Sequence, residues 1–209
     1  MSEDQPIELA ALRLPFDHRR WNLVTRFLAL RKSVFIDRLK WDLYHVQDLE
    51  FEQYDYLGAV YIVAHRGTEV VGGARLLRTD WRYGRGKYVY SYMIRDAWLG
   101  LLPGLPREVC ADEPPVSAKV WELTRLAAMT PGIAADVLTA ANAYLAGQNA
   151  EECLFLGPTS FMRMARSMGY QPRALGAITG NKDGRFIAFG CGVRHDLSLE
   201  NRPPAAVAA

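Results

Sequence analysis

The sequence predicts an α/β (α+β) protein, a single-domain three-layer sandwich in which a mixed, twisted sheet is flanked by helices. Its 209 residues, half of them hydrophobic, suffice for one substantial core and do not require a second domain. The hydrophobic patterns follow the order helix, hairpin, short helix, strand, long helix, strand, helix, hairpin. A long helix between two strands is a right-handed crossover joining parallel strands, so we expect a mixed sheet with helices on both faces.

Periodicity and chain breakers predict the individual elements. In chain order they are one or two helices over 21–40 that end near Trp41, a hairpin of 56–65 and 70–79, a short helix at 92–102, a strand at 120–128, a helix from Pro131 to Leu145, a strand at 153–157, a helix at 160–168, and closing strands at 177–178 and 185–193. Residues 80–90 and 104–118 are predicted to be loops. The ends, 1–8 and 202–209, are expected to be disordered, and 1–209 forms one domain.

Gly72 and Gly73 fall inside the second strand of the predicted hairpin. Glycine weakens a strand, and there it usually marks a bulge or a close approach of backbone or ligand. Close packing of two small residues explains the pair equally well, so both interpretations stay open.

Composition excludes several classes of protein. No apolar run approaches the roughly 18 residues of a membrane span, and the N-terminus lacks the character of a signal peptide, so we expect a cytoplasmic protein. The net charge of +2 is too small for a dedicated nucleic-acid binder. Three scattered cysteines predict neither a disulfide framework nor a zinc site, and no His, Cys and acid cluster suggests another metal.

The charge of the chain changes abruptly at Trp41. Residues 13–41 contain eight Lys or Arg and two Asp, whereas residues 42–55 contain five acids and no Lys or Arg. Arg31, Phe35 and Trp41 precede this change and suggest a cation-binding cage, with carboxylates placed to orient arginines beside an aromatic pocket. The alternative is two solvated faces of opposite charge.

Charged residues also lie inside predicted strands. Glu122 and Arg125 interrupt the otherwise apolar strand at 120–128, and Arg75 interrupts the one at 70–79. Residues three apart on a regular strand face opposite sides, so Glu122 and Arg125 converge only if a bulge intervenes. A structural ion pair, an edge-strand carboxylate or a solvated arginine would also account for these residues.

Seven of these residues resemble, in order and nearly in spacing, the signature of acyl-homoserine-lactone synthases of the LuxI type. They are Arg31, Phe35, Trp41, Asp55, Arg75, Glu122 and Arg125. The likeness spans roughly residues 24–170. One position departs from it, because the chain has Glu52 where the family normally carries an aspartate, which keeps the charge and lengthens the reach.

The resemblance implies a fold related to N-acetyltransferases and a two-step reaction. Members of the family join an acyl group from acyl carrier protein, or in some relatives from acyl-coenzyme A, to the amino group of S-adenosylmethionine. Lactonisation then expels methylthioadenosine and leaves a quorum-sensing signal. Both compounds are substrates, so no cofactor is expected. A Gly-rich pyrophosphate loop before the long helix is not evident, which makes a nucleotide cradle there doubtful.

The resemblance also assigns roles to residues. Six would bind S-adenosylmethionine: Arg31, Phe35, Trp41, Glu52, Asp55 and Arg75. Aromatic rings would face the sulfonium cation, and the acids would orient the arginines. Glu122 would take the proton of the attacking amine, while Arg125 would fix the orientation of Glu122 or stabilise the developing oxyanion. No metal is required.

Two further regions are expected to serve the acyl donor. A basic docking face for the acidic carrier protein would comprise Arg163, Arg166, Arg173, Lys182 and Arg185, and an acyl pocket would comprise Leu123, Phe155, Phe161 and Met162. An ordinary solvated face and ordinary core residues are the alternatives. The bulk of Phe155 predicts a short, branched or aromatic acyl chain in preference to a long 3-oxo chain.

Two other functions compete with this interpretation. One is a coenzyme A dependent N-acyltransferase acting on another amine, which the missing pyrophosphate loop and the aromatic and acidic residues near the N-terminus disfavour. The other is a binding module for an acyl carrier or S-adenosylmethionine without turnover. The presence of both Glu122 and Arg125 argues against that module.

Overall fold

The computed structural model describes residues 5–13, 15–86 and 88–197. Its strands are β1 (Glu8–Arg13), β2 (His45–Val46), β3 (Leu49–Glu50), β4 (Val60–Arg66), β5 (Glu69–Arg78), β6 (Tyr83–Arg85), β7 (Tyr88–Tyr90), β8 (Val120–Ala128), β9 (Glu152–Gly157), β10 (Arg173–Ala174), β11 (Thr179–Asn181) and β12 (Gly184–Gly192). Its helices are α1 (Trp21–Arg31), α2 (Met93–Trp98), α3 (Pro131–Gly147) and α4 (Thr159–Ser167), with short helices η1 (His18–Arg20), η2 (Lys32–Arg38), η3 (Arg107–Val109) and η4 (His195–Leu197).

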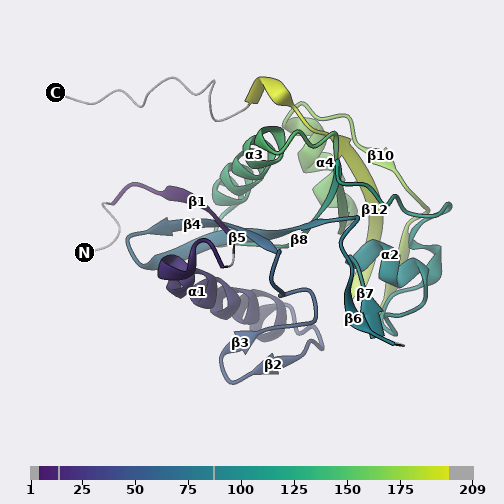
Figure 1. The fold of residues 1–209 in the computed structure, drawn as a ribbon, viewed down its shortest axis with the longest axis horizontal. Helices are drawn as coiled ribbons and strands as arrows, with labels where there is room; N and C mark the ends of the chain where they lie inside the picture. Colours follow the sequence, from purple (N-terminus) through teal and green to yellow (C-terminus); the bar gives the residue numbers. More distant parts are fainter. Residues whose placement is uncertain (1–4, 14, 87, 198–209) are drawn as a thin grey trace.

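One mixed sheet forms the centre of the molecule, in the order β1-β4-β5-β8-β9-β12-β10 with β11 paired to β12 (Figure 1). Neighbouring strands are antiparallel except β8 and β9, which are parallel and joined through α3. Parallel strands need such a crossover, so this part of the prediction is confirmed. The β8–β9 pairing extends only from Val120 to Leu123 on β8, although β8 continues to Ala128.

Local sequence explains why α3 begins and which face it buries. Thr130 caps its N-terminus by accepting a hydrogen bond from the Ile133 N–H at 3.4 Å, and Pro131 occupies the first turn, where its missing N–H costs nothing. Ile133, Val137 and Leu138 are buried, as helical spacing requires for a face packed on a sheet.

The sheet separates two hydrophobic cores. Strand residues alternate between them: Tyr61 and Val63 of β4 face the core under α1, whereas Val60 and Ile62 face the core under α3. Figure 1 shows α1 on one face of the sheet and α3 on the other. Helices on both faces of a mixed sheet confirm the predicted three-layer class.

The first helical region ends in an unusual way. α1 continues directly into η2, a π-helix, and the Leu39 N–H closes a wide turn onto the Val34 carbonyl at 3.0 Å. Lys40 then has a left-handed φ of 60°. π-helical turns are rare and frequent at functional sites. The predicted one or two helices ending near Trp41 are thus confirmed.

The structure departs from the sequence expectations about the fold in several places. The strand expected at 177–178 is not formed there, and β11 begins at Thr179 instead. Residues 80–90 are not all loop, because β6 and β7 form a hairpin there. The acidic run holds a second hairpin, β2–β3, which was not predicted. Glu8 is ordered in β1, opposite His65 of β4, so the expected disorder of residues 1–8 fails at Glu8. Residues 1–4 and 202–209 lie outside the described residues.

Gly72 and Gly73 satisfy both sequence interpretations. The register of β5 against β8 shifts between Gly73 and Arg75, which marks a bulge. A β-carbon added at Gly73 would lie 2.7 Å from the Ile62 carbonyl oxygen and 2.8 Å from the Phe27 ring. The glycines therefore allow α1 and β4 to approach β5 closely.

Replacing Gly73 by Ala should lower the free energy of unfolding by about 1–3 kcal/mol, because backbone must move to admit the methyl group. The matched control is Gly132→Ala in α3, where the nearest atom would be 3.9 Å away. That change should raise stability by about 0.5–1 kcal/mol. Urea unfolding of both variants measures the difference; equal stabilities would contradict the close packing at Gly73.

Candidate active site

Three arginines and three carboxylates form a closed ring of alternating charge. Arg31 binds Glu50 and, through two nitrogens, Asp55 at 2.8 and 3.0 Å. Arg75 pairs with Asp55 at 2.9 Å and with Glu52 at 2.6 Å. Arg125 closes the ring with contacts of 2.7 Å to Glu52 and 3.2 Å to Glu50. We call this ring the arginine–carboxylate cluster: Arg31, Arg75, Arg125, Glu50, Glu52 and Asp55.

Separate elements bring these side chains together. Arg31 ends α1, Glu50 lies in β3, and Glu52 and Asp55 follow in the next turn, where the Glu52 N–H donates to Asp55 at 3.0 Å. Two hydroxyls complete the cluster: Tyr61 donates to Asp55 at 3.0 Å, and Thr124 accepts from Arg75 Nε at 3.1 Å. Each buried charge is therefore paired and hydrogen-bonded, which is the condition for its burial.

A bulge in β8 turns Arg125 toward this cluster. Thr124 pairs with Arg75 and Ala127 with Gly73, so β8 carries one more residue than β5 over this stretch. Arg125 adopts a left-handed φ of 55°, an uncommon conformation for a non-glycine residue. Residues three apart on a regular strand face opposite sides, so Arg125 could lie on the same side of β8 as Glu122 only if a bulge intervened. The structure contains such a bulge.

Burial and pairing shift the pKa values of the cluster in opposite directions. Burial favours the neutral acid, but the charges of Arg75 and Arg31 hold the pKa of Asp55 well below its usual range. Those of Arg125 and Arg75 likewise lower the pKa of Glu52. Only Glu52 and Arg125 retain side-chain exposure, 13% and 9%. A ligand that reaches the cluster must approach from their side.

Glu122 lies apart from the cluster and is fully buried. Burial raises its pKa to about 7, although the N–H groups of Ile94 and Met93 oppose this by donating to its two oxygens, each at 2.8 Å. No described contact joins Arg125 to Glu122, so the expectation that Arg125 orients Glu122 is wrong. The start of α2 orients this carboxylate instead.

The aromatic pair is present, but its two rings are not equivalent. Phe35 stacks on Trp41 with ring centroids 5.1 Å apart and planes 11° apart, and the Arg125 guanidinium lies 5.9 Å from the Phe35 centroid. Phe35 is buried, whereas Trp41 is half-buried. Trp41 is therefore the ring able to face a cation, with Phe35 supporting it.

A small apolar cavity of about 30 Å³ lies on the α3 side of the sheet. Of the four residues predicted for an acyl pocket, Leu123, Phe155 and Phe161 line it and Met162 does not. Phe155 stacks on Phe189 at 5.0 Å, and Phe161 meets Phe155 edge-on at 5.3 Å. These rings leave little free volume.

The five residues predicted for a basic docking face are exposed but differ in charge compensation. Lys182 pairs with Asp42 at 2.8 Å, and Arg173 pairs with Glu152 at 2.8 Å. Arg163, Arg166 and Arg185 have no ion pair with any described residue. These three carry the uncompensated charge.

Sequence reasoning missed Glu50, although it lies in the acidic run that was singled out. Glu50 is fully buried and links Arg31 to Arg125. The alternation of acids with Leu49 and Phe51 around it is typical of a solvated face, and β3 is only two residues long, so nothing in the sequence indicated that Glu50 is buried. The partners Tyr61 and Thr124 were also missed, since both read as ordinary strand residues.

Residues 16–149, more than half of the chain, match the family model described as autoinducer synthase. The chain belongs to the autoinducer synthase family. An acyl-homoserine-lactone synthase of Acinetobacter nosocomialis is 25% identical over 168 residues, which cover 74% of this chain and 83% of that protein. The autoinducer synthase is thus an acyltransferase, an acyl-homoserine-lactone synthase, as the sequence resemblance implied.

Solved structures agree with this assignment. TofI, in a ternary complex with an inhibitor and MTA, has a TM-score of 0.71 at 26% identity over 93% of this chain and 95% of TofI. BjaI, a CoA-dependent acyl-homoserine lactone synthase with SAM and isopentyl-CoA, shares the fold at a TM-score of 0.76 and 17% identity over 92% and 86% of the two chains. A Lactobacillus plantarum protein described as an N-acetyltransferase shares the fold at 0.56 and 12% identity over 90% and 99%. The predicted N-acetyltransferase-like fold is confirmed.

Membrane-spanning helices and clusters of metal ligands were sought in the described part of the autoinducer synthase. Among residues 5–13, 15–86 and 88–197, no helix has the length and apolar character needed to cross a membrane. Within those same ranges, no three His, Cys, Asp or Glu side chains come together as metal ligands.

Replacing Asp55 by Asn should destabilise the protein by about 3–5 kcal/mol at pH 7, because Arg31 and Arg75 lose their shared buried partner. The folded-state pKa of Asp55 is depressed, so its contribution is present above the unfolded pKa of about 4 and is lost as pH falls through the folded value.

Urea unfolding at pH 7 and at several values below pH 4 measures this difference, which should shrink toward acid pH. Glu151→Gln, which removes a partner from the exposed pair with Lys119, serves as the control and should change stability by less than about 0.5 kcal/mol. A pH-independent loss at Asp55 would contradict the electrostatic explanation.

Proposed function

We propose that the autoinducer synthase uses Glu122 to activate the amine of S-adenosylmethionine for attack on an acyl thioester. The observation that carries this proposal is the position of Glu122, a buried carboxylate with a pKa near 7 on the α1 side of the sheet. A general base works best when its pKa lies near the operating pH. Each Glu122 oxygen accepts one backbone N–H and keeps a second lone pair for the proton.

The arginine–carboxylate cluster would supply a rigid, neutral wall for the substrate. Its three positive and three negative charges cancel, so ionised Glu122 leaves the region with a negative excess that favours a sulfonium cation. The half-buried Trp41 would add its ring face to this attraction. Arg125, 9% exposed, is the arginine nearest to solvent and would stabilise the developing oxyanion.

The acyl donor would reach the amine through the sheet. The apolar cavity lies on the α3 side and Glu122 on the α1 side, and pairing of β8 with β9 stops at Leu123 and Phe155. Beyond this point the two strands are no longer hydrogen-bonded to each other. The separation would let a thioester carbonyl meet the amine while the acyl chain enters the cavity.

An acyl carrier protein would deliver the chain to the same region. Arg163 and Arg166 lie on helix α4, which follows directly after β9. Arg185 lies in β12, near the point where β12 pairs with the end of β9. Uncompensated arginines suit an acidic partner through electrostatic steering. We propose that the reaction takes place in the cytoplasm, as the sequence expectation has it.

The direct test incubates the pure protein with S-adenosylmethionine and a panel of acyl-carrier and acyl-coenzyme A donors, without added metal or cofactor. We expect acyl-homoserine lactone and methylthioadenosine, identified by mass spectrometry. Absence of both with every donor would contradict the proposal. Lactone from coenzyme A donors alone would overturn the carrier-protein assignment, and acylation of another amine would favour the competing N-acyltransferase.

Glu122→Gln should lower turnover by about 10²- to 10⁴-fold. Affinity for S-adenosylmethionine should fall by much less than this, because the variant loses only the attraction of one carboxylate for the sulfonium cation. In the unmodified enzyme, kcat/KM should rise with pH through an apparent pKa of about 7, because only the ionised carboxylate accepts a proton. Full activity of the Gln variant would exclude Glu122 as the base. Glu151→Gln, an exposed change of the same type, should leave the pH profile intact.

The cavity predicts a preference for short, branched or aromatic acyl chains. Its 30 Å³ is small beside the roughly 150 Å³ that holds a benzene molecule, so a long chain must displace side chains. Phe161→Ala should enlarge the cavity and shift the lactone profile toward longer chains, measured by mass spectrometry with mixed donors. The control is Met162→Ala beside it, outside the lining; long 3-oxo lactones from the unmodified enzyme would contradict the prediction.

A further inference from the structure

A group of tyrosines borders the arginine–carboxylate cluster. Tyr56, one residue after Asp55, stacks on Tyr83 of β6 with centroids 4.0 Å apart and planes 22° apart. Tyr90 of β7 extends this group at 6.0 Å from Tyr83, and Tyr54 packs against Tyr90 at 6.3 Å. The Arg75 guanidinium lies 5.6 Å from the Tyr54 ring centroid. The β6–β7 hairpin thus closes one side of the cluster with aromatic rings.

The hydroxyls in this region differ in how they are satisfied. Tyr54 donates to Asp96 at 2.8 Å, Tyr61 to Asp55 at 3.0 Å, and Tyr92 to the Pro115 carbonyl at 2.6 Å.

By contrast, the Tyr56 and Tyr83 hydroxyl oxygens are buried and make no hydrogen bond to any residue that the structure describes. A buried hydroxyl without a partner costs about 1–3 kcal/mol. Two such groups, stacked side by side at the edge of a substrate site, are most simply explained as ligand-binding groups.

Burial and neighbouring charges shift the pKa values of both hydroxyls. Burial raises the pKa of Tyr56 to about 12, with Arg75 opposing the rise and Glu122 adding to it. Burial also raises the pKa of Tyr83, and Asp96 and Arg75 act on it as well. Arg75 and Asp96 act on both hydroxyls, in agreement with two rings that stack on each other beside the cluster. Both remain protonated at neutral pH and are able to donate.

The substrate carboxylate needs donors that the cluster does not provide. Each of its three guanidinium groups is already shared between two carboxylates. A further carboxylate would have to compete for these guanidinium groups with the acids that they already bind. Neutral O–H donors avoid this competition and still form charge-assisted hydrogen bonds.

We propose that the hydroxyls of Tyr56 and Tyr83 bind the amino-acid end of S-adenosylmethionine, donating to its carboxylate while Glu122 faces its amine. This assignment rests on the proposed function, since it presumes that S-adenosylmethionine is the acceptor. It explains why the β6–β7 hairpin packs, through Tyr83, against Tyr56 at the end of the turn that carries Glu52 and Asp55. With this assignment, the two tyrosines recognise the amino-acid part of S-adenosylmethionine and not its nucleoside part.

The test compares Tyr56→Phe and Tyr83→Phe with the unmodified protein by calorimetric titration. Each change removes one oxygen and keeps the ring, so the stack is preserved. The dissociation constant for S-adenosylmethionine should rise about tenfold or more, as for loss of a hydrogen bond to a charged group. The constant for methylthioadenosine, which lacks the amino acid, should stay within about twofold.

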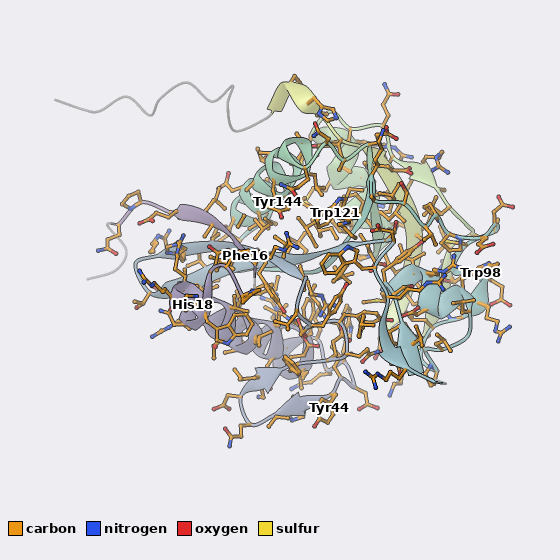
Figure 2. All side chains as sticks on the ribbon, in the orientation of Figure 1. Phe16, His18, Tyr44, Trp98, Trp121 and Tyr144 are labelled. Atoms are coloured by element: carbon orange, nitrogen blue, oxygen red, sulfur yellow. The ribbon has the colours of Figure 1, made fainter. Side chains whose placement is uncertain are left out.

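Thermal unfolding supplies a second readout. Because the hydroxyls have no partner in the free protein, both Phe variants should keep or raise the melting temperature. Tyr144→Phe is the matched control: Tyr144 lies on α3 beside Trp121, on the other side of the sheet (Figure 2), and its loss of a hydroxyl should leave both ligand affinities unchanged.

Three outcomes would overturn the assignment. Unchanged affinity for S-adenosylmethionine in both Phe variants would exclude the hydroxyls as binding groups. An equal loss for S-adenosylmethionine and methylthioadenosine would transfer them to nucleoside recognition. A fall in melting temperature with unchanged affinity would make them structural. If the unmodified protein binds neither compound, the proposed function itself fails, which is a distinguishable result.

Discussion

The ring of alternating charges is the interaction on which the rest of the structure depends. It joins the end of α1 to the centre of the sheet and to β3 with the turn after it, so three separate parts of the chain meet at six side chains. Desolvation of so many charges is costly, and only complete pairing offsets it. The acidic turn, the π-helix and the β8 bulge are all arranged so that each charge finds two partners.

Complete pairing in the ring has a functional consequence. A saturated, neutral cluster fixes geometry, and only its exposed edge at Arg125 and Glu52 is left to meet a substrate. Binding and proton transfer then fall to groups at its margin: Glu122, whose pKa is raised by burial, Trp41, and the tyrosine hydroxyls. Because one set of residues provides rigid support and another provides the reactive groups, the reactive groups are held in place before the substrate binds.

Prediction from sequence succeeded where the signal was local. The long helix α3 and strand β8 have strong periodicity, and their bounds agree closely with those expected. β1 and the β2–β3 hairpin were missed because their strands are short or depend on a distant partner: β1 is a strand only through its pairing with β4, some fifty residues later in the chain. Short strands gain their stability from tertiary contacts, not from propensity.

The sequence by itself determined the chemical inventory: the arginines, acids and aromatic residues of the site, and the order of helices and strands. Only the tertiary structure decided which charges meet, because partners such as Arg125 and Glu50 lie 75 residues apart. Spacing along a chain cannot encode that choice; burial does, since a buried charge without a partner is excluded. The same constraint placed Glu50 in the ring, oriented Glu122 by backbone N–H groups, and left Tyr56 and Tyr83 with hydroxyls to offer a substrate.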